Sequence, residues 1–264
     1  MTPDRVLAHL DTAQLWPGTP GHAAADLAEA YRTALAVRDL RVARGERPVG
    51  YKVGFTNRGI WARYNVAAPI WGCVFNTTLT FCDGEAELSL AGCCQPRLEP
   101  EVVFALRAAP PQAPTADQLF DCIDWMAPGI EVVQSHLPGW KFTAPDTVAD
   151  GGLHARLLVG PRCQVRAHAD SADALEAQLC AATVSLCRDG VEVEGGQGTN
   201  VLDGPLDALR HFVGELQQCN GAPALRAGDV VTTGTWTDAW PVAPGERWTA
   251  RFTAPLQPLA VRFT

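Results

Sequence analysis

The chain has 264 residues, of which 47% are hydrophobic and 19% charged, and its formal net charge is −8. The apolar fraction excludes wholesale disorder, and the lack of any run of about 18 apolar residues predicts no membrane span. The acidic balance argues against binding to duplex nucleic acid, because phosphate contacts need clustered positive charge.

Helices are predicted first at the start of the chain. Residues 3–14 have a weak helical pattern. Thr19-Pro20 has the form of an N-cap followed by proline, and apolar residues recur every four positions after it, which predicts an amphipathic helix over 21–44. Two further helices are predicted over 171–181 and 205–219.

Elsewhere, short apolar runs alternate with glycine, proline and aspartate, a pattern typical of strands. The predicted strands cover residues 49–55, 71–75, 79–81, 88–90, 98–106, 130–133, 155–159, 184–187, 191–193, 230–233, 248–252 and 259–263. Because strand–helix–strand alternation is absent, the order favours an α+β fold over a doubly wound sheet. We predict an N-terminal helical region over 1–48 and a β-core region over 49–264.

The strongest local signal lies in the strand 98–106, which contains Glu99 and Glu101. Residues two apart on a strand face the same side, so the two carboxylates project together, about 7 Å apart along the chain. If they are buried they repel each other unless a cation compensates, and a hard divalent ion such as Mg²⁺, Mn²⁺ or Ca²⁺ suits carboxylate oxygens. The alternative is two exposed glutamates on an edge strand marked by Pro100.

Glu131 is a third candidate ligand, because it lies in the otherwise apolar run 129–133 and a glutamate is seldom buried without a partner. Three carboxylates on Mg²⁺ would leave about three of six octahedral positions open. A 2-oxo acid can occupy two of them, through one carboxylate oxygen and the 2-oxo oxygen.

The chain has only two lysines, and each is a candidate for substrate contact. Lys52 lies among apolar residues, where a lysine either pairs with a carboxylate or has a lowered pKa that suits proton transfer. Its alternative role is a packed stem with the charged head in water. Lys141 follows Trp140 in a polar and aromatic loop that is either a lid over a small acid or a packed surface loop.

Taken together, these motifs resemble the 2-keto-4-pentenoate (2-hydroxypenta-2,4-dienoate) hydratases and 4-oxalocrotonate decarboxylases of the fumarylacetoacetate hydrolase superfamily. The matching stretches, in chain order, are 50–56, 69–75, 99–104, 129–133 with Trp140, 146–150, 228–235 and 241–245. They extend over about residues 45–264. Their combination is specific to the superfamily and is shared by its different reactions.

The resemblance implies a mixed β-roll core behind the N-terminal helices. It implies a Mg²⁺ or Mn²⁺ site at Glu99, Glu101 and Glu131 and an active-site lysine at Lys52. It also implies that Gly234 and Thr235 contact the substrate carboxylate, and that the protein forms a homo-oligomer.

The implied activity is a metal-dependent lyase reaction on a short 2-hydroxydienoate or 2-oxo acid from aromatic ring cleavage. The expected reaction is hydration, in which protonation at the far end of the diene is followed by addition of water to give a 4-hydroxy-2-oxo acid. Lys52 would position the substrate or move protons, and Lys141 would contact it. The alternatives are decarboxylation, hydrolysis of an acylpyruvate carbon–carbon bond with His136 or His154 as base, and a non-catalytic assembly subunit.

Several positions depart from the hydratase pattern. Asn76 stands where the family has an acid, Gln134 and His136 stand within its Asp-Ser-Arg motif, and Gly151 replaces an asparagine. Asn76 cannot transfer protons as an aspartate would. Since the ordinary pKa of histidine is near 6.5, His136 is predicted to take over acid–base catalysis; the alternative is a neutral hydrogen-bonding residue.

The compartment is predicted from the N-terminus and the cysteines. Residues 1–5 lack the basic start and apolar stretch of a signal peptide. Nine scattered cysteines without a CxxC pair are typical of reduced thiols. We therefore expect a cytoplasmic protein whose partner is a small acid rather than a nucleic acid or a membrane.

Overall fold

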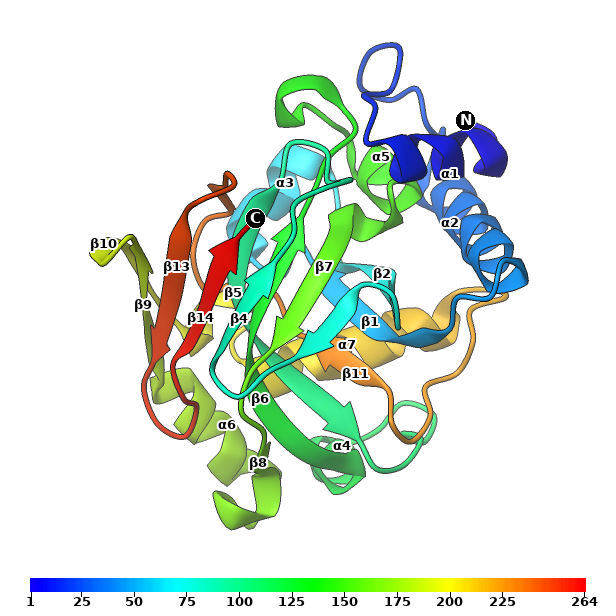
Figure 1. Ribbon diagram of the computed structural model, residues 1–264. Coiled ribbons are helices and arrows are strands. Elements are labelled where there is room, and N and C mark those ends of the chain that lie inside the picture. The colour runs from blue at the N-terminus through cyan, green and yellow to red at the C-terminus, as the bar shows by residue number, and fades with distance from the viewer.

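The computed structural model describes residues 1–264, and Figure 1 shows their arrangement. The helices are α1 (Pro3–Thr12), α2 (Leu27–Ala43), α3 (Trp61–Tyr64), α4 (Ala116–Cys122), α5 (Ala144–Ala149), α6 (Ala172–Ala181) and α7 (Pro205–Gln218). None of them is both long and apolar enough to pass through a bilayer.

The strands outnumber the helices and extend over most of the remaining chain. They are β1 (Pro48–Gly54), β2 (Ile70–Phe75), β3 (Leu79–Phe81), β4 (Glu85–Leu88), β5 (Arg97–Leu106), β6 (Ile123–Val133), β7 (His154–Val159), β8 (Cys163–Gln164), β9 (Thr183–Arg188), β10 (Val191–Gln197), β11 (Val230–Thr232), β12 (Trp240–Pro241), β13 (Arg247–Phe252) and β14 (Leu259–Phe263).

Two sheets make up the β-core. The nine-stranded sheet has the order β2-β1-β11-β5-β6-β7-β3, with β12 paired to β5 and β8 paired to β6. It is mixed, because β1 pairs with β11 and β3 with β7 in parallel, whereas β5 and β6 are antiparallel. The second sheet has the order β10-β9-β13-β14-β4 and lies beside β5 and β6 in Figure 1. The α+β class with a mixed β-core is therefore confirmed.

The main core explains why β5 and β6 read as nearly continuous apolar runs. It joins side chains of the large sheet to those of α7 and of the second sheet, among them Leu98, Phe104, Phe212, Trp236 and Trp248. Strands at the centre of a sheet are covered on both faces, so they keep apolar residues at successive positions. The glutamates of these two strands are the exceptions.

The N-terminal helices pack on the β-core through α5 and β2. A second apolar cluster joins Val6 of α1 and Val37 of α2 to Val148 of α5. The Trp71 backbone N–H at the start of β2 donates to the Tyr31 hydroxyl, 3.1 Å away. The division at residue 48 stays a prediction, since α2 and the sheet share these contacts.

Several predicted boundaries are wrong. The helix predicted over 21–44 begins at Leu27, because the Asp26 carboxylate, rather than Thr19, caps it by accepting from the Glu29 backbone N–H. The strand predicted over 88–90 ends at Leu88 instead: it is β4, an edge strand over Glu85–Leu88 in which glutamates alternate with apolar residues. The short elements α3, α4, α5, β8 and β12 were not predicted, since they span too few residues to show a period.

One close backbone approach holds β1 in the sheet. A side chain at Gly50 would place its Cβ 1.9 Å from the Val230 carbonyl oxygen of the neighbouring strand β11. Only glycine allows the two strands to meet there. The approach carries β1, and with it Lys52, next to the central strands.

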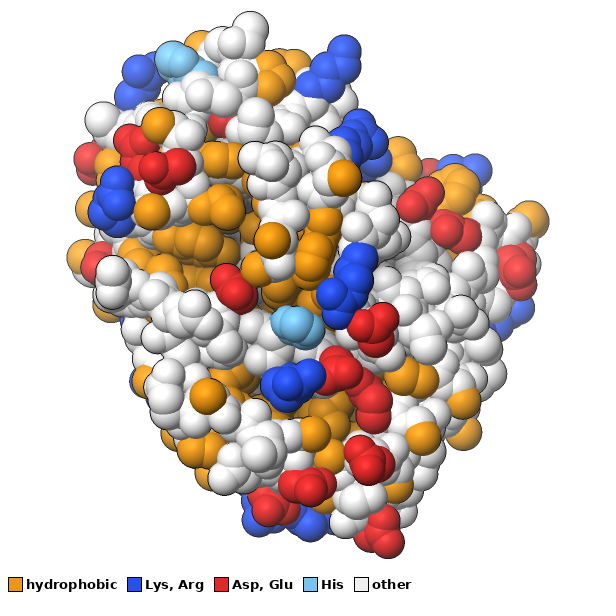
Figure 2. Space-filling model, turned by 180° about the vertical axis from the view of Figure 1, so that it is seen from behind, with side chains coloured by type: hydrophobic (Ala, Val, Ile, Leu, Met, Phe, Trp, Pro, Cys, Tyr) orange, Lys and Arg blue, Asp and Glu red, His pale blue; other side chains and the backbone are white.

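Seen from behind, the surface mixes charged and apolar side chains. Figure 2 shows hydrophobic side chains gathered in a hollow of this face, with acidic and basic side chains around it.

Candidate active site

Three carboxylates meet at the centre of the large sheet. Glu99 of β5 lies directly opposite Glu131 of β6 in the antiparallel register, and Glu101 shares the face of Glu99. One oxygen from each of the three side chains lies within 4.8 Å of the others. Glu101 and Glu131 are fully buried, whereas Glu99 is half-buried.

The cluster contains an oxygen with no hydrogen-bond partner. The Gly234 backbone N–H donates to Glu101 Oε2 over 2.7 Å, but Glu101 Oε1 is buried and unpartnered. Gly234 has a φ of +98°, and a Cβ there would lie 1.9 Å from the Thr56 hydroxyl, so only glycine can form this turn. A buried carboxylate oxygen without a donor fits a cation better than it fits an empty site.

The pKa shifts show that the three acids do not all ionise together. Burial, opposed by the Lys52 ammonium and reinforced by the Glu131 carboxylate, raises the pKa of Glu99 to about 7. Burial also raises the pKa of Glu101 well above its ordinary value. Burial would raise the pKa of Glu131 too, but Lys52 and His154 outweigh it and hold that pKa below its ordinary value. A divalent cation would allow all three to ionise.

Lys52 is the cation that the fold supplies. Its side chain is almost completely buried, and its Nζ lies 3.2 Å from Glu131 Oε2. Burial by itself would lower the pKa of Lys52, but the carboxylates of Glu131, Glu99 and Glu101 outweigh it and raise the pKa. Lys52 is therefore an ammonium that holds a proton beside the acids.

His154, at the start of β7, orients Glu131. Its Nδ1 lies 2.8 Å from Glu131 Oε1, and its Nε2 lies 2.8 Å from the Thr78 hydroxyl oxygen. Burial lowers the pKa of His154, so its ring is neutral. A carboxylate can only accept a hydrogen bond, so Nδ1 carries the proton and donates to Glu131, and Nε2 accepts from the Thr78 hydroxyl. The only sign in the sequence is a histidine directly before the strand predicted over 155–159.

A pocket opens above the acids, and we refer to it as the inner pocket. Its cavity is about 630 Å³, and it is lined by the predicted residues Lys52, Glu99, Gly234 and Thr235. A larger outer cleft of about 920 Å³ lies against it. The two share Arg63, Tyr64, Trp140 and Phe142, but none of the three glutamates lines the outer cleft. The inner pocket is therefore the candidate active site.

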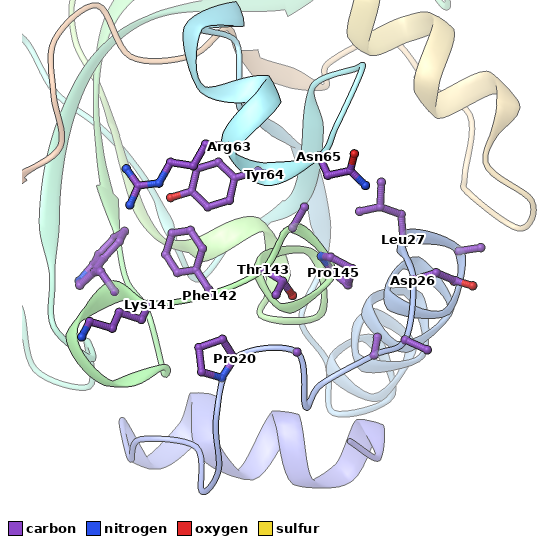
Figure 3. Close-up of a pocket in the computed structure, with 16 residues that line it drawn as sticks. Pro20, Asp26, Leu27, Arg63, Tyr64, Asn65, Lys141, Phe142, Thr143 and Pro145 are labelled. Atoms are coloured by element: carbon purple, nitrogen blue, oxygen red, sulfur yellow. The ribbon is translucent and has the colours of Figure 1, made fainter.

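Figure 3 shows the outer cleft, with Pro20, Asp26 and Leu27 facing Arg63, Tyr64 and Asn65 across it. The predicted substrate ligand Lys141 lines this cleft and does not line the inner pocket. Its loop begins at the 3₁₀ turn Pro138–Trp140 and leads into α5. The structure thus places Lys141 outside the pocket that holds the acids.

His136 does not reach the inner pocket either. It is fully buried, its Nδ1 lies 2.7 Å from Asp150 Oδ1, and its backbone N–H donates to Asp150 Oδ2. Its ring stacks on Trp16, with the ring centroids 6.2 Å apart. The position fits the alternative of a hydrogen-bonding residue, because Nδ1 and the backbone N–H of His136 are both bonded to the Asp150 carboxylate and not to the pocket.

The other departures from the family pattern also have structural contacts. The Asn76 side-chain oxygen accepts from the Arg47 backbone N–H next to β2. Gln134 accepts from the Cys94 N–H and donates to the His154 carbonyl oxygen. These substitutions therefore leave the acids and Lys52 in place.

Comparison with known proteins gives consistent matches. Residues 64–259 match the family model described as fumarylacetoacetate (FAA) hydrolase C-terminal. The chain is 31% identical over 237 residues to 2-hydroxyhexa-2,4-dienoate hydratase of Comamonas testosteroni, covering 89% of this chain and 85% of the relative. It is 32% identical over 210 residues to 2-keto-4-pentenoate hydratase of Burkholderia vietnamiensis, covering 79% and 76%.

A solved structure matches over the whole length. It is 4-oxalocrotonate decarboxylase of Pseudomonas putida G7 complexed with magnesium and adipate, with a TM-score of 0.84 and 26% identity. The match covers 100% of this chain and 99% of that one. The same enzyme has also been solved with calcium and acetate.

Proposed function

The chain belongs to the fumarylacetoacetate hydrolase family, and on that premise we propose that it is a divalent-metal-dependent hydro-lyase that hydrates a short 2-hydroxydienoate. The observation that carries the proposal is the cluster of three carboxylates beside a buried lysine, of which Glu99 and the lysine, Lys52, line a pocket. The relatives named as hydratases support the reaction type.

Glu99, Glu101 and Glu131 would hold the metal, Mg²⁺ or Mn²⁺. The unpartnered Glu101 Oε1 and the raised pKa of Glu99 support this assignment, since a divalent ion relieves both. When bound, the ion supplies Lewis-acid polarisation of the carboxylate and 2-oxygen of the substrate.

Lys52 would position the substrate. The acids around it raise its pKa and hold its ammonium charged beside Glu99, which suits binding an anionic dienoate better than giving up a proton. Thr235 would contact the substrate carboxylate. The Gly234 N–H is already donated to Glu101, so Gly234 serves the site by orienting a ligand of the metal.

An aromatic row forms one wall of the inner pocket. Phe55 stacks on Tyr64 with centroids 4.8 Å apart, Tyr64 on Phe142 at 5.6 Å, and Trp140 meets Phe142 edge-on at 6.0 Å. A planar conjugated acid packs well against such a wall.

Decarboxylation of a 2-oxo dicarboxylic acid is the second candidate. It is favoured by the solved structure that matches the whole chain, which is that of a decarboxylase. Hydrolysis of an acylpyruvate has less support, because it needs a base at the scissile carbonyl and neither His136 nor His154 lines the inner pocket. A non-catalytic subunit would have no use for the buried acids and Lys52.

The metal site is tested with oxalate, which mimics the chelating end of a 2-oxo acid. We expect calorimetry to detect oxalate binding to the wild type only with Mg²⁺, and no such binding to Glu101→Ala. Glu87→Ala, which removes an exposed acid with no ion pair, is the matched control and should bind like the wild type. Oxalate binding that ignores Mg²⁺ or Glu101 would refute the proposal.

The reaction is tested by product analysis. Incubation with 2-hydroxypenta-2,4-dienoate should consume the diene chromophore and yield a 4-hydroxy-2-oxo acid. Release of CO₂ from 4-oxalocrotonate without hydration would establish the second candidate instead.

We also propose that the protein acts in the cytoplasm as a homo-oligomer. The hydrophobic side chains gathered in the hollow of Figure 2 support an interface between copies. Light scattering should give a mass that is a multiple of the chain mass, and a monomer at micromolar concentration would refute this part.

A further inference from the structure

The inner pocket contains one fixed acid that does not belong to the metal cluster. Three carboxylic acids line this pocket, namely Glu99, Glu194 and Asp238. Glu99 is part of the cluster, and the Asp238 side chain is exposed. Glu194 is half-buried and lies outside the cluster, so its carboxylate is available for another purpose.

A bulge in the edge strand β10 turns Glu194 towards the pocket. Glu192 and Glu194 stand opposite successive residues of β9, so Val193 between them is an extra residue. Without it the two glutamates would share one face of the strand, and the extra residue re-aims the second side chain. Glu192 accordingly lines a separate cleft, whereas Glu194 lines the inner pocket.

Two donors hold the Glu194 carboxylate in place. The Trp240 indole N–H donates to Oε2 over 2.6 Å, and the Asp238 backbone nitrogen lies 3.1 Å from Oε2 and 3.2 Å from Oε1. Trp240 belongs to β12, where it stands opposite Leu98 of β5, the residue next to Glu99. These bonds therefore tie Glu194 to the strand that carries a ligand of the proposed metal.

The carboxylate keeps an oxygen for a molecule in the pocket. Glu194 forms no ion pair, and its Oε1 has only the longer contact with the Asp238 nitrogen. Each carboxylate oxygen has two lone pairs, so Oε1 can accept a hydrogen bond from a water molecule.

Hydration needs a group that takes a proton from the attacking water. No histidine or cysteine lines the inner pocket, and its one lysine, Lys52, is an ammonium paired with Glu131. A tyrosine phenol ordinarily ionises only at about pH 10, so it is a poor base in neutral solution. Among the groups that line the pocket, Glu194 is therefore the fixed base outside the metal cluster.

We propose that Glu194 is the catalytic base that binds and activates the water added during hydration. The O–H bond of the water breaks as its oxygen bonds to carbon 4 of the conjugated 2-oxo acid, and the proton passes to Glu194. The π electrons of the bond between carbons 3 and 4 shift towards the 2-oxygen and give an enolate. The proton then returns from Glu194 to carbon 3 as the 4-hydroxy-2-oxo acid forms.

This assignment gives the pocket an acid that Asn76 does not supply, since Asn76 stands where the family has an acid and does not line the pocket. It rests on the proposed function, because it takes hydration as the reaction.

The test separates the two steps of hydration. Proton NMR in D₂O follows 2-hydroxypenta-2,4-dienoate incubated with the enzyme and Mg²⁺. The wild type should give 4-hydroxy-2-oxopentanoate, whereas Glu194→Gln should stop at 2-oxopent-3-enoate with deuterium at carbon 5, formed faster than without enzyme. The rate of hydration should fall about 100-fold or more, as is typical for a lost general base. The affinity for oxalate with Mg²⁺ should not change.

Two further variants separate the base from a structural role. Glu192→Gln removes a carboxylate from the same strand outside the inner pocket, and should hydrate like the wild type. Glu194→Ala should lose hydration and regain part of it when formate is added, because formate can enter the vacated place and accept the proton. Formate should not accelerate the wild type.

Hydration by Glu194→Gln at the wild-type rate overturns this inference, and Asp238→Asn then tests the exposed acid as the base. Loss of deuterium incorporation together with hydration also overturns it, because the residue would not be specific to the addition of water. Absence of hydration by the wild type overturns the proposed function instead. The two failures are therefore distinguishable.

Discussion

Replacing His154 by alanine should weaken the metal site without removing any of its acids. The substitution deletes the 2.8 Å hydrogen bond to Glu131 Oε1 and leaves that buried carboxylate with the Lys52 contact alone. Groups that orient a metal ligand in this way contribute about 10–100-fold to metal affinity, which is about 1.4–2.7 kcal/mol. We expect a loss in that range, because His154 is itself fixed by Thr78 and no other donor reaches Oε1.

The assay is a Mg²⁺ titration followed by calorimetry in the presence of oxalate. His154→Gln retains an N–H that can reach the carboxylate and should recover part of the loss. His136→Asn is the matched control, since it also alters a fully buried histidine bonded to an acid but lies outside the inner pocket. It should lower thermal stability and leave Mg²⁺ affinity unchanged. A folded His154→Ala protein with wild-type Mg²⁺ affinity would refute the reasoning.

Three further predictions follow from the described contacts. Because burial raises the pKa of Glu99 to about 7, Mg²⁺ binding at pH 6 should release protons and strengthen towards pH 7; a binding enthalpy independent of the buffer's ionisation enthalpy would contradict this. Gly50→Ala should destabilise the fold by about 3 kcal/mol or more in urea unfolding, since the new Cβ would overlap the Val230 carbonyl. Gly214→Ala on α7 is the control: a Cβ there meets no atom within 4 Å, so the substitution should stabilise the fold by up to about 1 kcal/mol. Burial would raise the pKa of Glu46, but hydrogen bonds from two arginines and a threonine hold that pKa at about 2. Glu46→Gln should therefore lower the free energy of unfolding by about 1 kcal/mol above pH 4.5, and by progressively less as the pH falls towards 2. An equal loss of stability at pH 7 and pH 3 would contradict the pairing.

Much of the fold could be predicted because its elements carry their own periodicity. The strands that contain Glu99 and Glu131 are long apolar runs, and α7 follows a Gly-Pro start with a clear apolar stripe. The predicted beginning of α2 was wrong because Thr19 and Asp26 can both cap a helix, and only the structure shows that Asp26 does so. A local sequence pattern cannot decide which of two suitable capping residues begins a helix.

The site was partly predictable for a similar reason. Alternation on a strand puts Glu99 and Glu101 on one face, and an isolated acid in an apolar strand marks Glu131 as unusual. The sequence could not rank its histidines. His136 and His154 both lie near apolar strands, and which of them points at an acid of the pocket depends on the path of the chain between β6 and β7.

The sequence by itself determined the family, the α+β class and the residue types of the acidic cluster, because these are recorded in spacing and in the identity of single residues. Tertiary structure alone decided that Glu131 stands opposite Glu99, that Lys52 pairs with Glu131 and that Lys141 lies in the outer cleft. It also brought Phe55, Tyr64 and Phe142 together in one wall of the inner pocket. The physical reason is that strand register and the packing of distant segments depend on the whole buried core, whereas a periodic pattern specifies only which face a residue takes.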